Sequence, residues 1–126
     1  MIDIDRFKLI NDNYGHDTGD KLLIHITQKM SVLCGKDCFL GRLGGDEFAI
    51  VCLSKNSIEQ MALNLLKITK KPILIDGYCC DISLSIGICY SREEHETWVD
   101  ILKDADAAMY HAKEKGGGQY QIYEKS

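Results

Sequence analysis

Residues 38–53 read CFLGRLGGDEFAIVCL. Apolar side chains recur through 38–43 and again through 47–53, and Gly44 and Gly45 stand between the two stretches. Paired glycines adopt the positive φ values of a tight hairpin turn without steric cost. We therefore predict two antiparallel strands, joined at the glycine pair, whose turn displays the two acidic residues that follow it.

Upstream of this hairpin, the first five residues alternate apolar and acidic side chains, which predicts a strand over 1–5. A helical stretch follows at about 6–13. Asp17 or Thr18 is suited to cap a second helix, whose apolar face comprises Leu22, Leu23, Ile26, Met30 and Leu33. The first strand begins without a lead-in, so we expect the sequence to lack an N-terminal segment.

Downstream, residues 57–60 resemble a capping box for a helix that is finished by Pro72. Apolar residues then alternate with small ones over 82–89, which predicts a strand with something packed closely on its second face. Thr97 caps a last helix that ends at the glycines of 116–118, and a short strand at 120–123 follows.

The order of these elements is strand, helices, hairpin, helix, strand, helix, strand. It predicts one α+β domain over 1–126, with a central, mostly antiparallel but mixed sheet surrounded by helices. A chain of 126 residues, 45% of them apolar, is long enough to bury one real core and leaves no room for a second.

Charge and cysteine content limit the classes of partner. A net charge of −4 provides no basic field for nucleic acid or for contact with an anionic membrane. A small anionic ligand remains compatible, because acidic side chains hold metal ions that supply positive charge. The six cysteines include no CxxC pair, and buried reduced thiols in a cytoplasmic domain are favoured over disulfides.

The acidic residues at the strand ends carry the first chemical signal. Asp3 and Asp5 lie two apart in a predicted strand and face the same way. Asp46 and Glu47 point to opposite faces, so one of them can meet Asp3 across neighbouring strands. Alone, the first pair also suits a solvated strand edge. Clustered carboxylates favour Mg²⁺ or Mn²⁺, and two such ions serve phosphoryl transfer.

A longer pattern resembles a known family. It comprises Leu-Gly-Arg-Leu-Gly-Gly-Asp-Glu-Phe at 40–48, Asp-x-Asp-x-Phe-Lys with Asn-Asp and Gly-His-x-x-Gly-Asp over 3–20, and Ala-Asp-x-Ala-x-Tyr-x-Ala-Lys at 105–113. Together these residues are similar to the GGDEF domain of diguanylate cyclases over essentially the whole chain, without the family's N-terminal helix. The resemblance implies a sheet wrapped by helices, similar to the palm of polymerases and to nucleotidyl cyclase domains.

The resemblance implies a metal site and a catalytic pair. By position, Asp3 and Asp46 resemble the metal-bridging carboxylates, with the backbone carbonyl of Ile4 as a further ligand. The implied cofactor is Mg²⁺ or Mn²⁺, with two ions per GTP site. Asp46 is the candidate proton acceptor. Glu47 resembles a second acidic residue that supports the metal site or activates the 3′-hydroxyl, and a solvated turn acid is its structural alternative.

The resemblance also implies a GTP site. Asn11 and Asp20 match the guanine-reading pair, and an ionised carboxylate accepts well from the two adjacent N–H donors of guanine. Both residues also suit helix ends without any ligand. Further substrate-binding positions, in the phosphate segment, the glycine turn and the last helix, are Phe7, Lys8, His16, Gly45 and Lys113.

Two departures from the family pattern concern regulation and phosphate binding. The RxxD product-inhibition motif is replaced by Gly35, Lys36, Asp37 and Cys38, which predicts that no inhibitory site is present. Gly117 stands where the family usually has an arginine, which weakens the expected grip on the triphosphate.

The function that the resemblance implies is a diguanylate cyclase. Two domains, each holding one GTP, would meet as a homodimer, so that each 3′-hydroxyl attacks the other α-phosphate and cyclic di-GMP and two pyrophosphates form. A sensor or dimerising module is expected N-terminal to the domain in a full-length protein, which could be membrane-tethered. One alternative is a catalytically weak or inactive module that binds GTP and regulates a partner. Another is a transferase of the same fold with a different purine product, which Asp20 disfavours.

Overall fold

A computed structural model describes residues 1–54 and 57–124 of the chain. In chain order its elements are β1 (Ile2–Asp5), α1 (Phe7–Tyr14), α2 (His16–Cys34), β2 (Cys38–Gly44), β3 (Glu47–Cys52), α3 (Ile58–Ile68), β4 (Ile73–Ile75), β5 (Tyr78–Cys80), β6 (Ser83–Ile88), α4 (Trp98–Glu114) and β7 (Gln119–Ile122).

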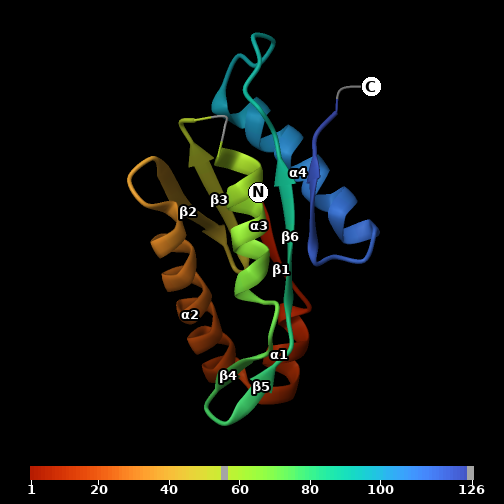
Figure 1. Cartoon of the computed structure of the whole chain (residues 1–126). Helices are drawn as coiled ribbons and strands as arrows, with labels where there is room; N and C mark the ends of the chain where they lie inside the picture. Colours follow the sequence, from red (N-terminus) through yellow and green to blue (C-terminus); the bar gives the residue numbers. More distant parts are fainter. Residues whose placement is uncertain (55–56, 125–126) are drawn as a thin grey trace.

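The main sheet has five strands in the order β2-β3-β1-β6-β7. The central strand β1 runs antiparallel to both of its neighbours, β3 and β6. The edge strand β7 runs parallel to β6, because α4 makes a crossover between them. The predicted α+β architecture with a mixed, mostly antiparallel sheet is confirmed (Figure 1).

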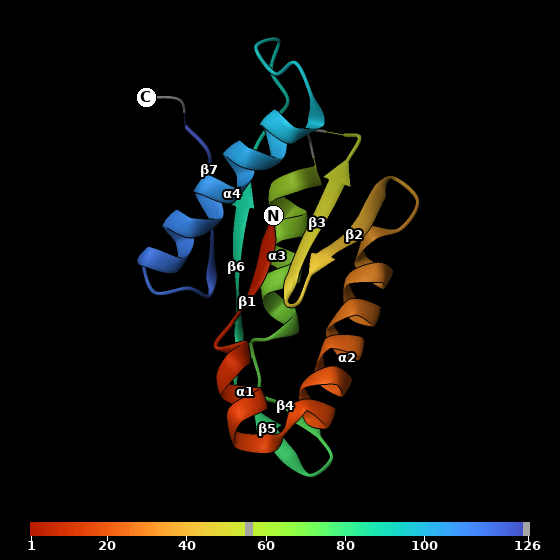
Figure 2. The ribbon, with the colours of Figure 1, turned by 180° about the vertical axis from the view of Figure 1, so that it is seen from behind.

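Alternation along β1 separates the two faces of the sheet. Ile2 and Ile4 are buried in the main core together with residues of α2, α3 and β6. Asp3 and Asp5 lie on the opposite face, which α4 covers; Figures 1 and 2 show α3 and α4 on opposite sides of the sheet. Asp3 is therefore buried beneath α4, and Asp5 is half-buried beside the loop that follows this helix, so neither lies at an open strand edge.

The close approach predicted for the small-residue face of β6 is confirmed. Gly87 lies directly beneath α4, where an added Cβ would overlap backbone atoms of Ala105 and Met109. The helix presents small residues to this face, and Ala105, Ala108 and Ala112 are buried. Small side chains on both elements thus let α4 pack close to the sheet beside Asp3.

The β2–β3 hairpin turns one residue later than predicted. Gly44 still pairs with Glu47, so the turn comprises Gly45 and Asp46, and the register shifts between Arg42 and Gly44. Both glycines have positive φ, 156° and 44°, as their pairing predicted. The Arg42 Nε–H donates to the Gly45 carbonyl at 2.9 Å and fastens the turn.

Helix starts were predicted with mixed success. Thr97 and Asp100 form a complete capping box at the start of α4, as predicted for Thr97. The predicted cap at Asp17 or Thr18 is wrong, because α2 begins at His16 directly after Gly15 and Thr18 is buried within the helix. The predicted box at Ser57 is also wrong: its side chain makes no cap hydrogen bond and instead donates to Ser54.

The β4–β5 hairpin was not predicted. Its turn is Asp76-Gly77, with φ of 50° and 84°, a dipeptide typical of two-residue hairpins. The hairpin packs at the end of the molecule that carries α1, where Tyr78 stacks on Tyr14 with ring centroids 4.5 Å apart. Lys21 on α2 pairs with Asp76 at 2.8 Å. These contacts connect the β4–β5 hairpin to both α1 and α2, next to the junction between the two helices.

All six cysteines are free thiols, as the predicted reduced state requires. Five of them are buried or half-buried, whereas Cys79 is exposed, so the prediction of uniform burial is wrong at that position. Among the described residues, no helix has the length and hydropathy needed to cross a membrane.

Candidate metal and nucleotide site

The end of β1 and the turn of the β2–β3 hairpin meet in the middle of the sheet. Asp3 lies directly opposite Glu47, so these two side chains share a face. The Ile4 N–H donates to the Asp46 carbonyl at 3.2 Å. The structure therefore brings together the four residues predicted to form the metal and catalytic group, with Glu47 rather than Asp46 as the direct cross-strand partner of Asp3.

Asp3 is a buried carboxylate with incomplete hydrogen bonding. The residue is 4% exposed, and its Oδ2 is ion-paired with the ammonium group of Lys113 at the end of α4. Its Oδ1 is the buried side-chain oxygen that lacks a hydrogen-bond partner among the described residues. An unsatisfied buried carboxylate oxygen is costly, which makes this atom a natural ligand for a cation.

Asp5 lies two residues along the same strand, and both of its carboxylate oxygens accept hydrogen bonds from the protein. Its Oδ1 accepts from the Ser85 hydroxyl at 2.6 Å, and its Oδ2 accepts from the Ser83 hydroxyl at 2.6 Å and from the Gly118 N–H at 3.0 Å. These bonds tie β1 to β6 and to the loop after α4. Asp5 is therefore a structural anchor, a role that the sequence pattern did not reveal.

The donor set around Asp3 fits a hard divalent cation. Glu47 lies opposite the buried Asp3, Asp46 precedes it in the turn, and both residues are half-buried. Mg²⁺ prefers oxygen ligands, uses one or two carboxylates and retains waters. The unpaired Oδ1 of Asp3, next to a turn that carries two further acids, matches that preference. The ion pair with Lys113 supplies one positive charge to the same carboxylate.

The predicted guanine-reading residues both lie at the junction of α1 and α2. Asn11 packs onto Gly19, where an added Cβ would overlap its amide oxygen and contact the ring of Phe7. Asp20 is the next residue and is exposed. Gly19 is thus required for the close contact, which holds the Asn11 amide beside the turn of α2 that bears Asp20.

The predicted phosphate-binding residues occupy the start of α1 and positions near it. Arg6 adopts a left-handed conformation at φ 60° immediately before α1 and turns the chain sharply after Asp5. Phe7 is half-buried and Lys8 is exposed, and His16, the first residue of α2, is exposed. The structure leaves the basic and polar groups of this segment open to solvent, as a site for phosphate requires.

Gly117 has a packing role that the sequence departure did not indicate. Its φ is 74°, and an added Cβ would lie 2.5 Å from Oδ2 of Asp5. In this chain the position cannot carry an arginine without moving the anchor formed by Asp5. The positions that replace the RxxD motif lie elsewhere, with Gly35 ending α2 and Cys38 beginning β2.

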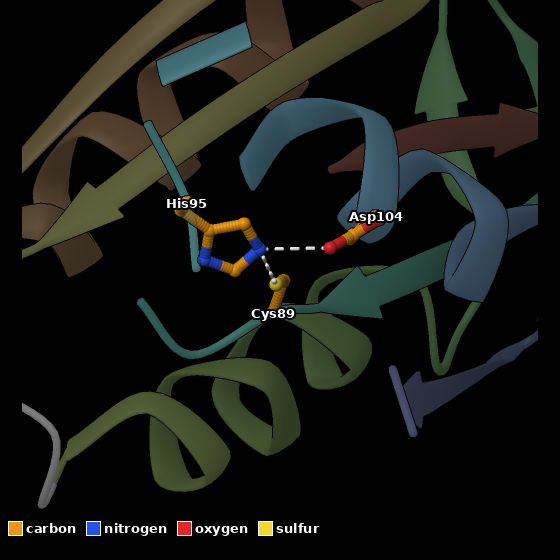
Figure 3. Close-up of side chains that lie close together, drawn as sticks. All are labelled: Cys89, His95 and Asp104. Carbon is orange, nitrogen blue, oxygen red and sulfur yellow. Dashed lines mark hydrogen bonds and ion pairs between the residues drawn. The ribbon is translucent and has the colours of Figure 1, made fainter. Parts of the chain in front are cut away.

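A second cluster of possible ligands, Cys89, His95 and Asp104, lies near the other end of α4 (Figure 3). His95 Nδ1 accepts from the Arg92 N–H at 3.0 Å, so Nε2 carries the proton and donates to Asp104 at 2.8 Å. A metal at Nε2 would force the proton onto Nδ1, against the Arg92 N–H. Hydrogen bonding in this cluster is complete without a metal, and it fixes the loop before α4.

Comparison with known proteins agrees with this arrangement. The family model for the diguanylate cyclase GGDEF domain matches residues 1–119. The chain belongs to the GGDEF domain family. It is 39% identical over 128 residues to diguanylate cyclase TpbB of Pseudomonas aeruginosa, covering 98% of this chain and 29% of that protein. It is 36% identical over 128 residues to the bifunctional diguanylate cyclase/cyclic di-GMP phosphodiesterase MucR of the same species, covering 100% and 19%.

A further relative is named as a phosphodiesterase. Cyclic di-GMP phosphodiesterase PdeB of Shewanella oneidensis is 34% identical over 126 residues, covering 98% of this GGDEF domain and 15% of PdeB. The domain therefore spans less than a third of each of these three relatives, which are larger proteins.

Solved structures confirm the fold of the domain. The crystal structure of the GGDEF domain of TpbB (YfiN) gives a TM-score of 0.91 at 37% identity, covering 99% of this chain and 80% of that one. The active GGEEF domain of a diguanylate cyclase from Vibrio cholerae gives 0.87 at 31% identity, covering 99% and 81%.

Proposed function

We propose that this GGDEF domain is a diguanylate cyclase, which condenses two GTP molecules into cyclic di-GMP and two pyrophosphates. The observation that carries the proposal is the unpaired Oδ1 of Asp3, buried beside the turn that bears Asp46 and Glu47. The similarity to proteins named as diguanylate cyclases, TpbB among them, supports the same reaction.

The proposed cofactor is Mg²⁺ or Mn²⁺, two ions per GTP, held by Asp3, Asp46 and the Ile4 carbonyl. When bound, such ions neutralise charge on the phosphates and lower the pKa of the attacking hydroxyl. Asp46, a half-buried residue of the turn, is the proposed acceptor of the proton of the 3′-hydroxyl. Glu47 lies opposite Asp3 on the neighbouring strand, and its negative charge would help to balance the positive charge of the bound ions.

The remaining residues bind and orient GTP. Asp20 and Asn11 accept from and donate to the edge of guanine at the α1–α2 junction, and Phe7 and Lys8 hold the phosphates through backbone N–H groups and the ammonium. Lys113 is paired with Asp3 here and is 37% exposed, so it is free to turn towards a phosphate when Asp3 gains a cation. Gly45, without a side chain, admits the ribose and phosphates.

The reaction requires two domains. Each holds one GTP, and the two nucleotides must lie antiparallel for each 3′-hydroxyl to attack the other α-phosphate. We therefore propose catalysis by a homodimer, with association driven by other segments of a longer protein, as the length of the relatives allows.

The second candidate is a GTP-binding regulatory module without turnover. It is favoured by the similarity to PdeB, which is named a phosphodiesterase, and by Gly117, which packs against Asp5 and cannot contribute a phosphate-binding arginine. The two functions differ in product formation but share GTP binding, so an assay must measure both.

The test uses the domain fused at its N-terminus to a dimeric coiled coil, incubated with Mg²⁺ and with GTP, ATP or their mixture. Chromatography identifies the products, and binding of a GTP analogue is measured in parallel. We expect cyclic di-GMP from GTP alone, lost in Asp46→Ala. Asp37→Ala, which removes an exposed acid at the open end of the β2–β3 hairpin, opposite to the turn, is the matched control and retains activity.

A dimeric fusion that binds the GTP analogue but releases no cyclic di-GMP contradicts the cyclase and leaves the regulatory module. A mixed product from GTP and ATP assigns the domain to a transferase of different purine specificity. Equal activity in Asp46→Ala and wild type removes Asp46 from the chemistry.

A further inference from the structure

Two cysteines face each other across the open end of the β2–β3 hairpin, opposite to the end that carries the turn. Cys38 begins β2, Cys52 ends β3, and they are direct partners in the strand register. Their Sγ atoms are 2.8 Å apart, although both residues are free thiols. This distance is shorter than an ordinary contact between two sulfur atoms and longer than the roughly 2.05 Å of a disulfide bond.

The backbone geometry of this pair suits a disulfide. The Leu53 N–H donates to the Asp37 carbonyl at 3.2 Å, so the adjacent pair, residues 37 and 53, is hydrogen-bonded. Hydrogen-bonded and non-hydrogen-bonded pairs alternate along an antiparallel ladder, which makes Cys38 and Cys52 a non-hydrogen-bonded pair. Such pairs have Cα atoms about 4.5 Å apart, inside the range of about 4.4–6.8 Å that a disulfide spans.

We propose that Cys38 and Cys52 form a reversible disulfide that ties the open end of the β2–β3 hairpin, and that the co-reactant is a low-molecular-weight disulfide. One cysteine thiolate attacks the small disulfide, and one small thiol leaves. The second cysteine then attacks the sulfur of the mixed disulfide, and the other small thiol leaves. The two cysteines lose two electrons and two protons, and the small disulfide becomes two thiols.

The two sulfurs take different parts in this exchange. Cys38 is 8% exposed, whereas Cys52 is half-buried, so an external disulfide reaches Cys52 first. Cys38 then lies behind it in position to resolve the mixed disulfide. Burial and the neighbouring Cys38 raise the pKa of the Cys52 thiol to about 12. Because the thiolate is the nucleophile, the exchange is slow at neutral pH and accelerates as pH rises.

The consequence of the bond is a more constrained hairpin. Cys38 and Cys52 are 14 positions apart in sequence, and a cross-link between them removes conformational freedom from the unfolded chain. It also fixes the register of β2 on β3, the pair of strands whose turn displays Asp46 and Glu47. The oxidised domain is therefore more resistant to urea than the reduced domain, and a reducing environment reverses the change.

Two other cysteine arrangements must be distinguished from this one. Cys34 is buried at the end of α2, and Cys38 contributes to raising its pKa, so the two thiols are neighbours. Cys79 is exposed beside Cys80 in β5 and will accept a mixed disulfide without any partner. Peptide mapping separates these cases, because trypsin cleaves after Lys36 and Arg42 and places Cys34, Cys38 and Cys52 in different peptides.

The experiment incubates the folded domain with oxidised glutathione, blocks the remaining thiols by alkylation, and maps the tryptic peptides by mass spectrometry. We expect a cross-linked pair comprising residues 37–42 and 43–55, which disappears on treatment with dithiothreitol. Its rate of formation should rise more than tenfold from about pH 7 to about pH 9. Urea unfolding is followed on the same samples, and the oxidised protein should have the higher midpoint.

Matched variants sharpen the test. Cys34→Ser should retain the cross-link, whereas Cys52→Ser, a substitution at the half-buried partner, should lose both the cross-link and the rise in urea midpoint. The proposal is overturned if residues 37–42 remain fully alkylated while the peptide with Cys79 is modified. It is equally overturned if, at equilibrium in the same buffer of oxidised and reduced glutathione, the cross-linked fraction is no larger in folded than in urea-unfolded protein, since the folded hairpin would then not favour the bond.

Discussion

Asp3 and Asp5 lie two residues apart on one strand and face the same side of one sheet, but their surroundings differ. Asp5 accepts three hydrogen bonds, from Ser83, Ser85 and Gly118, and ties three segments together. Asp3 has one charged partner, Lys113, and a buried oxygen without any. A carboxylate whose oxygens are all hydrogen-bonded by the protein stabilises the fold, whereas a carboxylate with an unsatisfied buried oxygen is available to a ligand.

The largest effect is expected from Asp3→Asn. The amide has one oxygen and no charge, so it cannot hold a divalent cation as the carboxylate does. We expect kcat for cyclic di-GMP formation to fall by about 1,000-fold, the scale reached when one charge-stabilising group is lost. The free energy of unfolding should change by no more than about 1 kcal/mol, because the exposed Lys113 ammonium returns to water. Assay of the dimeric fusion together with urea unfolding checks both values.

Asp5→Asn should have the opposite profile. The amide nitrogen cannot accept from a serine hydroxyl or from the Gly118 N–H, and the remaining bonds lose their charge. We expect the free energy of unfolding to fall by about 3 kcal/mol. Metal affinity of the protein that remains folded should be unchanged. A variant as stable as wild type would show that the three bonds to Asp5 contribute little.

A smaller effect is expected at Gly117, the glycine that packs on Asp5. Gly117→Ala combines a positive φ with overlap against Oδ2, and should lower the free energy of unfolding by about 2 kcal/mol. Gly116→Ala is the control, because Gly116 has φ of 112° but open space around it, so only about 1 kcal/mol is expected. Thermal or urea unfolding of the two variants side by side measures the difference. Equal losses would show that overlap with Asp5 adds nothing to the cost of the substitution at Gly117.

The smallest effect is expected from removing one of the serine hydroxyl groups that donate to Asp5. Ser85→Ala leaves the Oδ1 of Asp5 without its hydroxyl partner in a fully buried position, and should cost about 1.5 kcal/mol. Ser83→Ala, at a half-buried position, should cost less, because water can replace its hydroxyl. Chemical denaturation resolves the order of the two, and the reverse order would contradict the burial argument.

Much of the fold could be predicted from the sequence, because periodicity reports burial directly. The alternation of 82–89 predicted both β6 and a close partner on its small-residue face, and α4 is that partner. The three-residue strands β4 and β5 escaped prediction because each is too short to show a period, although Asp76-Gly77 carried the signal of a hairpin. The predicted caps at Thr18 and Ser57 failed because a capping side chain marks a helix start only where the local backbone allows it.

The location of the candidate site could be predicted from the sequence. The different roles of Asp3 and Asp5 within it could not. The spacing predicted that Asp3 and Asp5 lie on one face of a strand. It also predicted that a turn with two acidic residues lies close to Asp3. It could not show that Glu47 pairs with Asp3, since this depends on the register between β1 and β3. Nor could it show that Asp5 is satisfied, since its donors come from residues 83, 85 and 118, distant in the chain. The Cys38–Cys52 contact depends on register in the same way.

The most direct test of the division between Asp3 and Asp5 is a titration with Mn²⁺, followed by electron paramagnetic resonance in the presence of a non-hydrolysable GTP analogue. Wild type and folded Asp5→Asn should bind the ion with equal affinity, and Asp3→Asn should not bind it at the same site. Tight Mn²⁺ binding by Asp3→Asn, or its loss in folded Asp5→Asn, would contradict the assignment of Asp3 as the metal ligand and Asp5 as the anchor.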